Sequence, residues 1–388
     1  MTPEELVGRT RLLILQPTPF CNIDCSYCYL PARNDRHRMS FETIEAAVRF
    51  VFDNKLNAPD LTVVWHAGEP LVLPVHWYRQ AFAAASRGAP AVTMLPHAFQ
   101  TNAMLIDDEW CDFFLEHSVR LGVSIDGPDW LHDARRRTRA GQGTHARVMK
   151  GVELLQRRGV PFHVICVVGE KTLAAADALV EFFLNHGIHD VGFNIEEIEG
   201  ANRRSTLQTS DVSARFEQFV KRLLKVARES RCPFIIREQR ELLALMQSSM
   251  FGRLLHNSQN EPFAFISVSA RGAVFTFSPE LAGLQSPQYG DFSIGQLPEI
   301  NLPEVLSAPQ FRAMLSDIEV GVSECRDSCK YFDLCLGGAP VNKLSEHGDF
   351  KRSETLHCKL YHQTFAEAVL LDLEQSLRLR TQMPANCR

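Results

Sequence analysis

The chain lacks any apolar run of the roughly 18 residues needed to cross a bilayer, and its N-terminus lacks the basic-then-apolar pattern of a secretory signal. It also lacks an excess of positive charge, since its 388 residues carry a formal net charge of -5. We therefore expect a cytoplasmic protein with neither membrane nor nucleic-acid partners. The exception is a local basic run, which a solvated face explains better than a nucleic-acid patch does: Arg135, Arg136, Arg137 and Arg139.

Cysteine, in contrast, is plentiful, with 11 copies. Thiols are kept reduced in the cytosol, so this number points to bound metal rather than to disulfides. Most of the cysteines fall into two groups. The remaining four stand apart and are expected to be packing or bystander residues: Cys111, Cys166, Cys232 and Cys387.

The first group, Cys21, Cys25 and Cys28, has the spacing C-x3-C-x2-C. A 4Fe–4S cluster normally takes four thiolates, one for each iron, so three cysteines leave one iron open to an exchangeable ligand. A zinc knuckle or a set of buried thiols is the alternative. It is disfavoured because zinc prefers four ligands in a closed site, and the sequence has no fourth Cys or His at knuckle distance.

The second group, Cys325, Cys329, Cys335 and Cys358, offers four thiolates. Four ligands complete a closed 4Fe–4S cluster, which is suited to electron transfer rather than to binding substrate. Structural zinc is a stronger alternative here than at the front of the chain, because four cysteines also suit zinc.

Between residues 12 and 194, short β-branched apolar runs alternate with longer segments of helical period, which is typical of βα units around a parallel sheet. Strands are predicted at 12–16, 61–66, 94–100, 121–124, 162–168 and 191–195. These units predict an α/β fold with a partial (β/α)6 TIM-like barrel. Barrel enzymes build their sites at the carboxyl ends of the strands, and the first cysteine group directly follows the first strand.

Beyond the barrel we expect helices at 210–230 and 239–256, followed by a hairpin whose strands are FAFISV and AVFTFS. A final helix at 360–379 is expected to pack against the barrel. The pattern divides the chain into a barrel at 1–230, a cysteine-bearing domain at 231–358 and a C-terminal helix at 359–388.

Polar residues follow the predicted strands at the same edge of the sheet. The loops HAGEP, QTN and SIDGP contribute Ala67, Gly68, Glu69, Pro70, Gln100, Asn102, Ser124 and Asp126. Short polar groups at strand ends suit a nucleoside, whose hydroxyls need close and fixed partners. Each loop alone is also a common turn sequence, so the interpretation depends on their occurring together and in strand order.

The cysteine loop, with Tyr27 before its third cysteine, resembles the signature of the radical S-adenosylmethionine (radical SAM) superfamily. The resemblance implies that S-adenosylmethionine occupies the open iron. It also implies that the HAGEP loop corresponds to a Gly-Gly-Glu-Pro motif that holds the methionine amino group, with Ala67 departing at the first position, and that Ser124 meets the ribose. Arg147 lies where related peptide-modifying enzymes place a basic residue for the cosubstrate carboxylate, and a surface arginine on the fourth helix is an equal alternative.

The rear cysteine region resembles the SPASM extension, of twitch type, found in enzymes that modify ribosomal peptides. That extension often binds two auxiliary clusters, but residues 265–285 contain no cysteine, so we expect one auxiliary 4Fe–4S cluster. Strings such as GFNIEEIEG, TFSPEL and LGGAPVNKLSEHGDF look like the cyclophane-forming maturases of the Grr type. Those enzymes join an aromatic ring carbon to the Cβ of a residue two positions on in a precursor peptide.

The implied reaction begins when a 5'-deoxyadenosyl radical abstracts hydrogen from Cβ, and it ends with loss of one electron and one proton from the ring. The rear cluster would accept the electron. Candidates for the general base lie after the sixth strand and in TFSPEL: Glu196, Glu197, Glu199 and Glu280. The expected partners are the precursor peptide and an electron donor such as flavodoxin or ferredoxin. With about eleven residues before the first strand, leader recognition is expected at the barrel mouth, at 230–262 or on a separate protein.

Other functions remain open. Anaerobic sulfatase maturases, which form formylglycine, share this architecture but normally bring two auxiliary clusters, and a thioether-forming maturase would need a cysteine-bearing substrate. Outside enzymes, an iron–sulfur electron carrier or a metal-stabilised peptide-binding module would need none of the cosubstrate loops. The presence of AGEP, QTN and SIDGP therefore disfavours that class.

Overall fold

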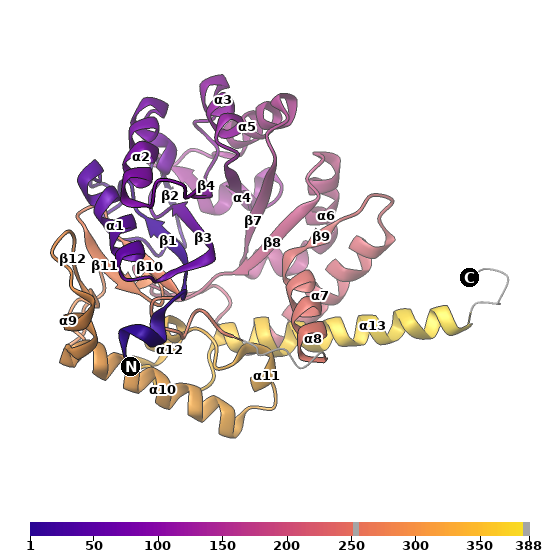
Figure 1. The fold of residues 1–388 in the computed structure, drawn as a ribbon. Helices are drawn as coiled ribbons and strands as arrows, with labels where there is room; N and C mark the ends of the chain where they lie inside the picture. Colours follow the sequence, from indigo (N-terminus) through magenta and orange to yellow (C-terminus); the bar gives the residue numbers. More distant parts are fainter. Residues whose placement is uncertain (251–255, 383–388) are drawn as a thin grey trace.

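The computed structural model describes residues 1–250 and 256–382, and within them the main sheet has ten strands in the order β12-β11-β10-β1-β3-β4-β5-β7-β8-β9 (Figure 1). Its strands are β1 (Thr10–Leu15), β3 (Asn57–Trp65), β4 (His97–Thr101), β5 (Arg120–Ser124), β7 (Phe162–Val168), β8 (Asp190–Ile195), β9 (Ile235–Ile236), β10 (Phe265–Val268), β11 (Ala273–Thr276) and β12 (Gly295–Gln296). Strands β1, β3, β4, β5, β7 and β8 pair in parallel, which confirms the six predicted strands.

Helices connect these strands and cover the sheet. They are η1 (Pro3–Leu6), α1 (Phe41–Asp53), η2 (Pro70–Val72), α2 (Val75–Gly88), α3 (Asp108–Glu116), α4 (Asp129–Arg135), α5 (His145–Arg158), η3 (Glu170–Ala174), α6 (Ala176–Asn185), α7 (Val212–Glu229) and α8 (Arg237–Met250). Local signals set their ends. The Ser40 hydroxyl caps α1 by accepting from the Thr43 N–H at 3.1 Å, and Gly159 ends α5 in the left-handed region, with φ of 69°.

The apolar faces of these helices and strands meet in one core. Trp65 at the end of β3 is fully buried and packs edge-on against Tyr78 of α2, with ring centroids 5.3 Å apart. Phe99 of β4 lies 4.9 Å from the same tyrosine ring. Burying large aromatic side chains of this kind contributes roughly 1.5–3 kcal/mol each. The strand ends above the core are therefore rigidly held.

The predicted hairpin of β10 and β11 is present as an antiparallel pair. It does not form a separate sheet, because β10 pairs in parallel with β1, and Leu12 is opposite Phe265. The cysteine-bearing part of the chain therefore begins as a continuation of the barrel sheet. A second, two-stranded sheet joins β2 (Ile23–Cys25) to β6 (Arg136–Thr138).

The C-terminal part is helical and lies along one side of the sheet in Figure 1. It contains η4 (Pro279–Leu281), α9 (Leu302–Ser307), α10 (Pro309–Ser328), α11 (Phe332–Cys335), α12 (Pro340–His347), the π-helical η5 (Cys358–Thr364) and α13 (Phe365–Gln382). The predicted final helix is confirmed, and α13 packs against α7. The predicted helix at 239–256 is confirmed as α8 up to Met250, while residues 251–255 and the tail with Cys387 lie outside the described residues. Within the described ranges, no helix is both long and apolar enough to span a membrane.

Candidate active site

The loop after β1 places the first three cysteines on the wall of a cavity of about 410 Å³. Cys21, Cys25 and Cys28 are each half-buried. The cavity lies at the carboxyl ends of the parallel strands, where a barrel enzyme builds its site. The loop gains regular structure as β2, in which Cys25 pairs with Arg136 of β6.

The basic run that includes Arg136 braces this loop. Arg136 is buried, and its Nε lies 3.0 Å from Asp126 Oδ2, which also accepts the Tyr27 hydroxyl at 2.7 Å. The Arg135 guanidinium stands 4.1 Å above the Tyr27 ring, and Arg139 donates to the Cys21 carbonyl at 2.8 Å. The expectation of a solvated face was therefore wrong for Arg136, which is buried, and for Arg135, which is partly buried, whereas Arg137 and Arg139 are exposed.

Asp126 supports the cavity wall from behind. It is buried, and its Oδ1 accepts the Val167 N–H at 3.0 Å. Although burial raises the pKa of Asp126, the Arg136 and Arg135 guanidiniums hold it below its usual value. The carboxylate is thus used by Tyr27 and Arg136, and it is not among the residues that line the cavity. This placement makes Asp126 a positioning residue.

The HAGEP loop crosses the cavity wall in a conformation that suits its residues. Ala67 has φ of 66° and Gly68 has φ of 106°. A Cβ on Gly68 would lie 2.1 Å from the Thr18 carbonyl oxygen, so this position requires glycine. Ala67 reaches the left-handed region at a cost of about 1 kcal/mol, which explains how alanine replaces the expected glycine there.

Glu69 is held by three donors. Its carboxylate accepts from the Thr101 hydroxyl at 2.6 Å, the Asn102 N–H at 2.8 Å and the Leu71 N–H at 3.0 Å. Burial raises the pKa of Glu69 to about 7 despite these donors. A ligand ammonium next to this carboxylate would favour its charged form. Pro70 begins η2 and is buried in the core, so it shapes the loop without lining the cavity.

Three further predicted residues line the cavity beside this loop. Gln100 donates from Nε2 to the Ser124 hydroxyl at 2.9 Å, and Asn102 donates from Nδ2 to Asn22 Oδ1 at 2.7 Å. The structure therefore brings together Gln100, Asn102 and Ser124 from the ends of successive strands. Arg147 is different, because it is exposed on α5 and does not line the cavity, so its role stays a prediction.

The four glutamates predicted as candidate bases all line the cavity, and three of them, Glu197, Glu199 and Glu280, form an acidic cluster. Asn342 of α12 donates from Nδ2 to both Glu197 and Glu199, the second at 3.1 Å, and the Ser278 hydroxyl donates to Glu280. Burial raises the pKa of each of these three carboxyls, and the charges of Glu197 and Glu280 raise that of Glu199 further.

Glu196 differs from the other three. Its Oε2 lies 3.3 Å from Arg135 Nη2 and accepts the Thr206 N–H at 3.2 Å. Glu196 therefore ties the loop after β8 to the braced cysteine loop.

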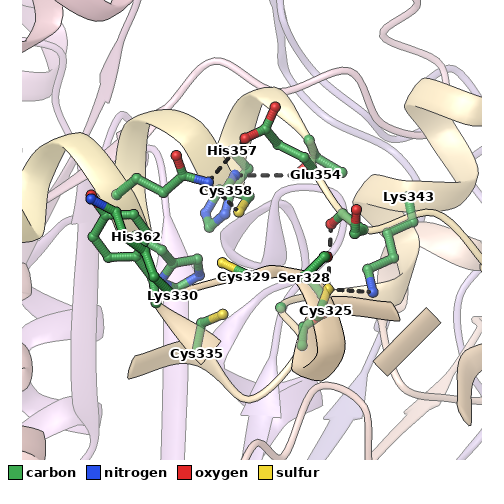
Figure 2. Close-up of a pocket in the computed structure, with 17 residues that line it drawn as sticks. Cys325, Ser328, Cys329, Lys330, Cys335, Lys343, Glu354, His357, Cys358 and His362 are labelled. Atoms are coloured by element: carbon green, nitrogen blue, oxygen red, sulfur yellow. Dashed lines mark hydrogen bonds between the residues drawn. The ribbon is translucent and has the colours of Figure 1, made fainter. Parts of the chain in front are cut away.

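The second cysteine group lines a pocket of about 260 Å³ (Figure 2). In Figure 2 the sulfurs of Cys325, Cys329, Cys335 and Cys358 face a shared space, although the cysteines come from α10, α11, η5 and the turn between α10 and α11. His357 lines this pocket and also the central cavity, where its Nε2 lies 3.7 Å from Glu197 Oε1. The two sites therefore meet at His357, and Ala339 also lines both.

The donor chemistry of both sites fits iron–sulfur clusters. Burial raises the pKa of Cys21 to about 12, and those of Cys25 and Cys358 to about 11. Such thiols become thiolates when they bind a cation. In residues 1–250 and 256–382, no three His, Cys, Asp or Glu side chains converge closely enough to hold a single ion. A cubane binds each thiolate on a different iron.

Several lining residues had no signal in the sequence. Tyr29 and His66 meet in the cavity, with the Tyr29 hydroxyl 3.2 Å from His66 Nε2, and burial lowers the pKa of His66 to about 4. Asn342 and Lys343 approach the two sites only through the folding of α12. Arg136 was visible within the basic run, and His357 is next to Cys358, but neither pattern indicated a role.

A model of the radical SAM superfamily matches residues 15–183. The uncharacterized protein sll1766 of Synechocystis sp. is 39% identical over 376 residues, which cover 96% of this chain and 94% of that protein. The chain belongs to the radical SAM superfamily. It is accordingly an enzyme, and its cofactors include a 4Fe–4S cluster and S-adenosylmethionine.

Other relatives carry more informative names. The serine-type anaerobic sulfatase-maturating enzyme of Bacteroides thetaiotaomicron is 26% identical over 390 residues, covering 94% of this chain and 91% of that enzyme. The solved structure of native anSMEcpe with bound AdoMet and Cp18Cys peptide has a TM-score of 0.75 at 20% identity, covering 94% of this chain and 98% of that one. Streptococcus suis SuiB bound to precursor peptide SuiA has a TM-score of 0.63 at 16% identity, covering 91% and 77%. Both solved structures share the fold.

Proposed function

We propose that this enzyme is a peptide maturase of the cyclophane-forming type, which joins an aromatic ring carbon to the Cβ of a residue two positions on in a ribosomally made precursor. One observation carries the proposal. The acidic cluster of Glu197, Glu199 and Glu280 shares one cavity with the cysteine loop. A crosslink of this kind removes two hydrogens from the peptide, so the site needs both a hydrogen acceptor and a base.

When bound, the front cluster and S-adenosylmethionine supply a radical that takes one hydrogen atom, and a rear cluster supplies an electron acceptor. The chain's own residues then complete the reaction. The cavity walls hold the peptide with its Cβ toward the cysteine loop and its ring toward the acidic cluster. One carboxylate of the cluster takes the ring proton. The peptide thus loses one hydrogen atom to the radical, one proton to the carboxylate and one electron to the rear cluster, which together equal two hydrogens.

Glu199 is the best placed base in this proposal. A raised carboxyl pKa brings the base closer to the operating pH and strengthens it for proton transfer. Asn342 holds Glu197 and Glu199 together, so a proton taken by one of them is shared by a hydrogen-bonded pair. Glu196 remains a weaker candidate because Arg135 and Thr206 already occupy its carboxylate.

We further propose that the C-terminal part is a SPASM-type extension with one auxiliary 4Fe–4S cluster on Cys325, Cys329, Cys335 and Cys358. The support is their common pocket and the absence of cysteine from residues 265–285. The expected domain limits of 1–230, 231–358 and 359–388 go with this proposal. The partners are then a precursor peptide and a flavodoxin or ferredoxin, and the compartment is the cytoplasm.

Sulfatase maturation is the second candidate. It is favoured by the full-length match to a serine-type anaerobic sulfatase-maturating enzyme and by the fold shared with anSMEcpe. Oxidation of serine to formylglycine also removes two hydrogens and also needs a base and an electron acceptor. The cavity is compatible with both substrates, so the loss of mass alone does not distinguish them.

Ring deuteration separates the two reactions. The enzyme is co-expressed with a short precursor peptide from its own gene neighbourhood, in cells fed ring-deuterated aromatic amino acids. Crosslinking removes one ring deuterium per motif, as tandem mass spectrometry would show, whereas formylglycine keeps the ring intact and reacts with a hydrazide. Conversion of a sulfatase serine peptide without any loss of ring deuterium would replace the first proposal with the second.

Glutamine variants test the base. Glu197→Gln, Glu199→Gln and Glu280→Gln are each assayed for crosslinked product and for release of 5'-deoxyadenosine. At least one variant should lose crosslinking while still cleaving S-adenosylmethionine. Unchanged crosslinking in all three variants would remove the acidic cluster from the mechanism.

A further inference from the structure

The rear pocket contains a buried lysine that the reaction has not yet accounted for. Lys343 of α12 is only 3% exposed, and its Nζ lies 3.4 Å from Cys325 Sγ (Figure 2). Among the described residues, its other hydrogen-bond partner is the Gly321 carbonyl at 2.8 Å. Burying an ammonium group is costly unless an anion compensates it. Within the described part of the chain, the side chain that Lys343 Nζ contacts is that of Cys325, whose sulfur would carry negative charge when it binds iron.

The fold makes room for this contact. Gly321 and Cys325 lie one turn apart on α10, so both face Lys343. A Cβ on Gly321 would lie 2.1 Å from the Phe350 carbonyl oxygen and 3.2 Å from Lys343 Nζ. Glycine at this position therefore lets the ammonium reach the helix backbone and the cysteine together.

Lys343 differs from the other lysines in and beside this pocket, because its side chain is buried and theirs are exposed. Lys330 lines the same pocket, but its side chain is 75% exposed and lies 3.2 Å from Glu367. Lys359 lies 2.9 Å from Glu354, and both side chains are about half-exposed. Exposed pairs of this kind are screened by water.

We propose that Lys343 is a positioning residue for the auxiliary cluster: it donates to the Cys325 thiolate and raises the reduction potential of that cluster. The inference rests on the auxiliary cluster proposed above. Reduction adds a negative charge to the cluster, and a buried ammonium stabilises that charge. Hydrogen bonds to cysteine sulfurs and net charge are among the factors that set cluster potentials. A higher potential suits a cluster that must accept an electron from the peptide.

The test uses the full-length chain with Cys21, Cys25 and Cys28 replaced by alanine, so that the rear cluster alone gives a signal. Its midpoint potential is measured by redox titration followed by electron paramagnetic resonance. Lys343→Met should lower the potential by at least the shift equivalent to a tenfold change in a one-electron equilibrium, about 59 mV. Lys330→Met is the matched control, because it removes an exposed charge from the same pocket. Its midpoint potential should differ from the parent value by less than about 59 mV.

Two further variants guard against a folding defect in Lys343→Met. Lys343→Arg keeps the charge, so its midpoint potential should differ from the parent value by less than about 59 mV. Lys343→Gln removes the charge, so its midpoint potential should fall as that of Lys343→Met does. If the rear cluster assembles but Lys343→Met and Lys343→Gln have the parent potential, the role of Lys343 is wrong and the auxiliary cluster stands. If the parent triple variant binds no iron, the auxiliary cluster is wrong and the role of Lys343 falls with it.

Discussion

Asp126 and Arg136 form a buried ion pair, with Asp126 Oδ2 3.0 Å from Arg136 Nε. Asp126 follows β5, and Arg136 begins β6, which pairs with the cysteine loop. Tyr27, from within that loop, donates to the same carboxylate oxygen. The position of the cysteines thus depends on this ion pair. Arg136 lines the cavity, whereas Asp126 lies behind its wall.

Removing one partner of this pair should leave an uncompensated buried charge. We expect Arg136→Met to destabilise the apoprotein by about 3–5 kcal/mol in denaturant unfolding. We also expect it to reduce iron bound at the front site, since the loop loses its brace. The control is Arg137→Met in the same strand, which removes an exposed charge and should cost at most about 0.5 kcal/mol. Equal effects of the two variants would contradict the brace.

Substitutions of the two small residues of the HAGEP loop should differ in the size of their effects. Gly68→Ala places a methyl group 2.1 Å from the Thr18 carbonyl and should weaken S-adenosylmethionine binding at least about tenfold. Ala67→Gly relieves a positive φ but adds freedom to the unfolded chain, so stability should change by less than about 1 kcal/mol. Equilibrium binding and thermal unfolding measure the two effects. Normal binding by Gly68→Ala would show that the loop tolerates displacement.

The rear cysteines should account for a separate share of the iron. Cys358→Ala should lower the iron content of anaerobically reconstituted protein by about four atoms per chain, while 5'-deoxyadenosine is still released. Cys232→Ser, at an exposed position outside both groups, should leave the iron unchanged. Iron and sulfide analysis would distinguish these results. Loss of one zinc atom in place of iron would make the rear site a structural zinc site.

Crosslinking should depend on pH through the acidic cluster. Burial and the neighbouring Glu197 raise the pKa of Glu199, so at low pH its carboxyl is protonated and cannot act as a base. The ratio of crosslinked product to 5'-deoxyadenosine should therefore rise as pH increases through that raised pKa. In Glu199→Gln the ratio should be low and nearly independent of pH. A wild-type ratio that falls with pH would exclude a carboxylate base.

The barrel could be predicted because its signals are local. Apolar runs of strand length recur between helical segments, and polar loops follow the strands, so strand order and the lining roles of Gln100, Asn102 and Ser124 came from the sequence. The pairing of β10 with β1 could not be predicted, because more than 250 residues separate Leu12 from Phe265 and no local pattern specifies such a contact.

Two features had no such local signals: the contact of the arginine run with the cysteine loop, and the contact of Asn342 and His357 with the acidic cluster. A run of arginines predicts a solvated face until the fold supplies a buried carboxylate, which Asp126 does here. Arg147 satisfied a position in a motif, but α5 turns it to solvent. Asn342 and His357 reach the acidic cluster only because α12 and η5 pack beside the barrel mouth. Such roles arise from tertiary packing rather than from residue spacing.

Asn342 and Lys343 are consecutive residues of α12, yet one reaches the acidic cluster and the other reaches Cys325. A rotation of this short helix would move both side chains at once. In the proposed mechanism, the groups that would take up the proton and the electron are therefore contacted by adjacent residues of one helix. Substitutions in the helix should be inherited in compensating sets, because a change that benefits one event disturbs the other.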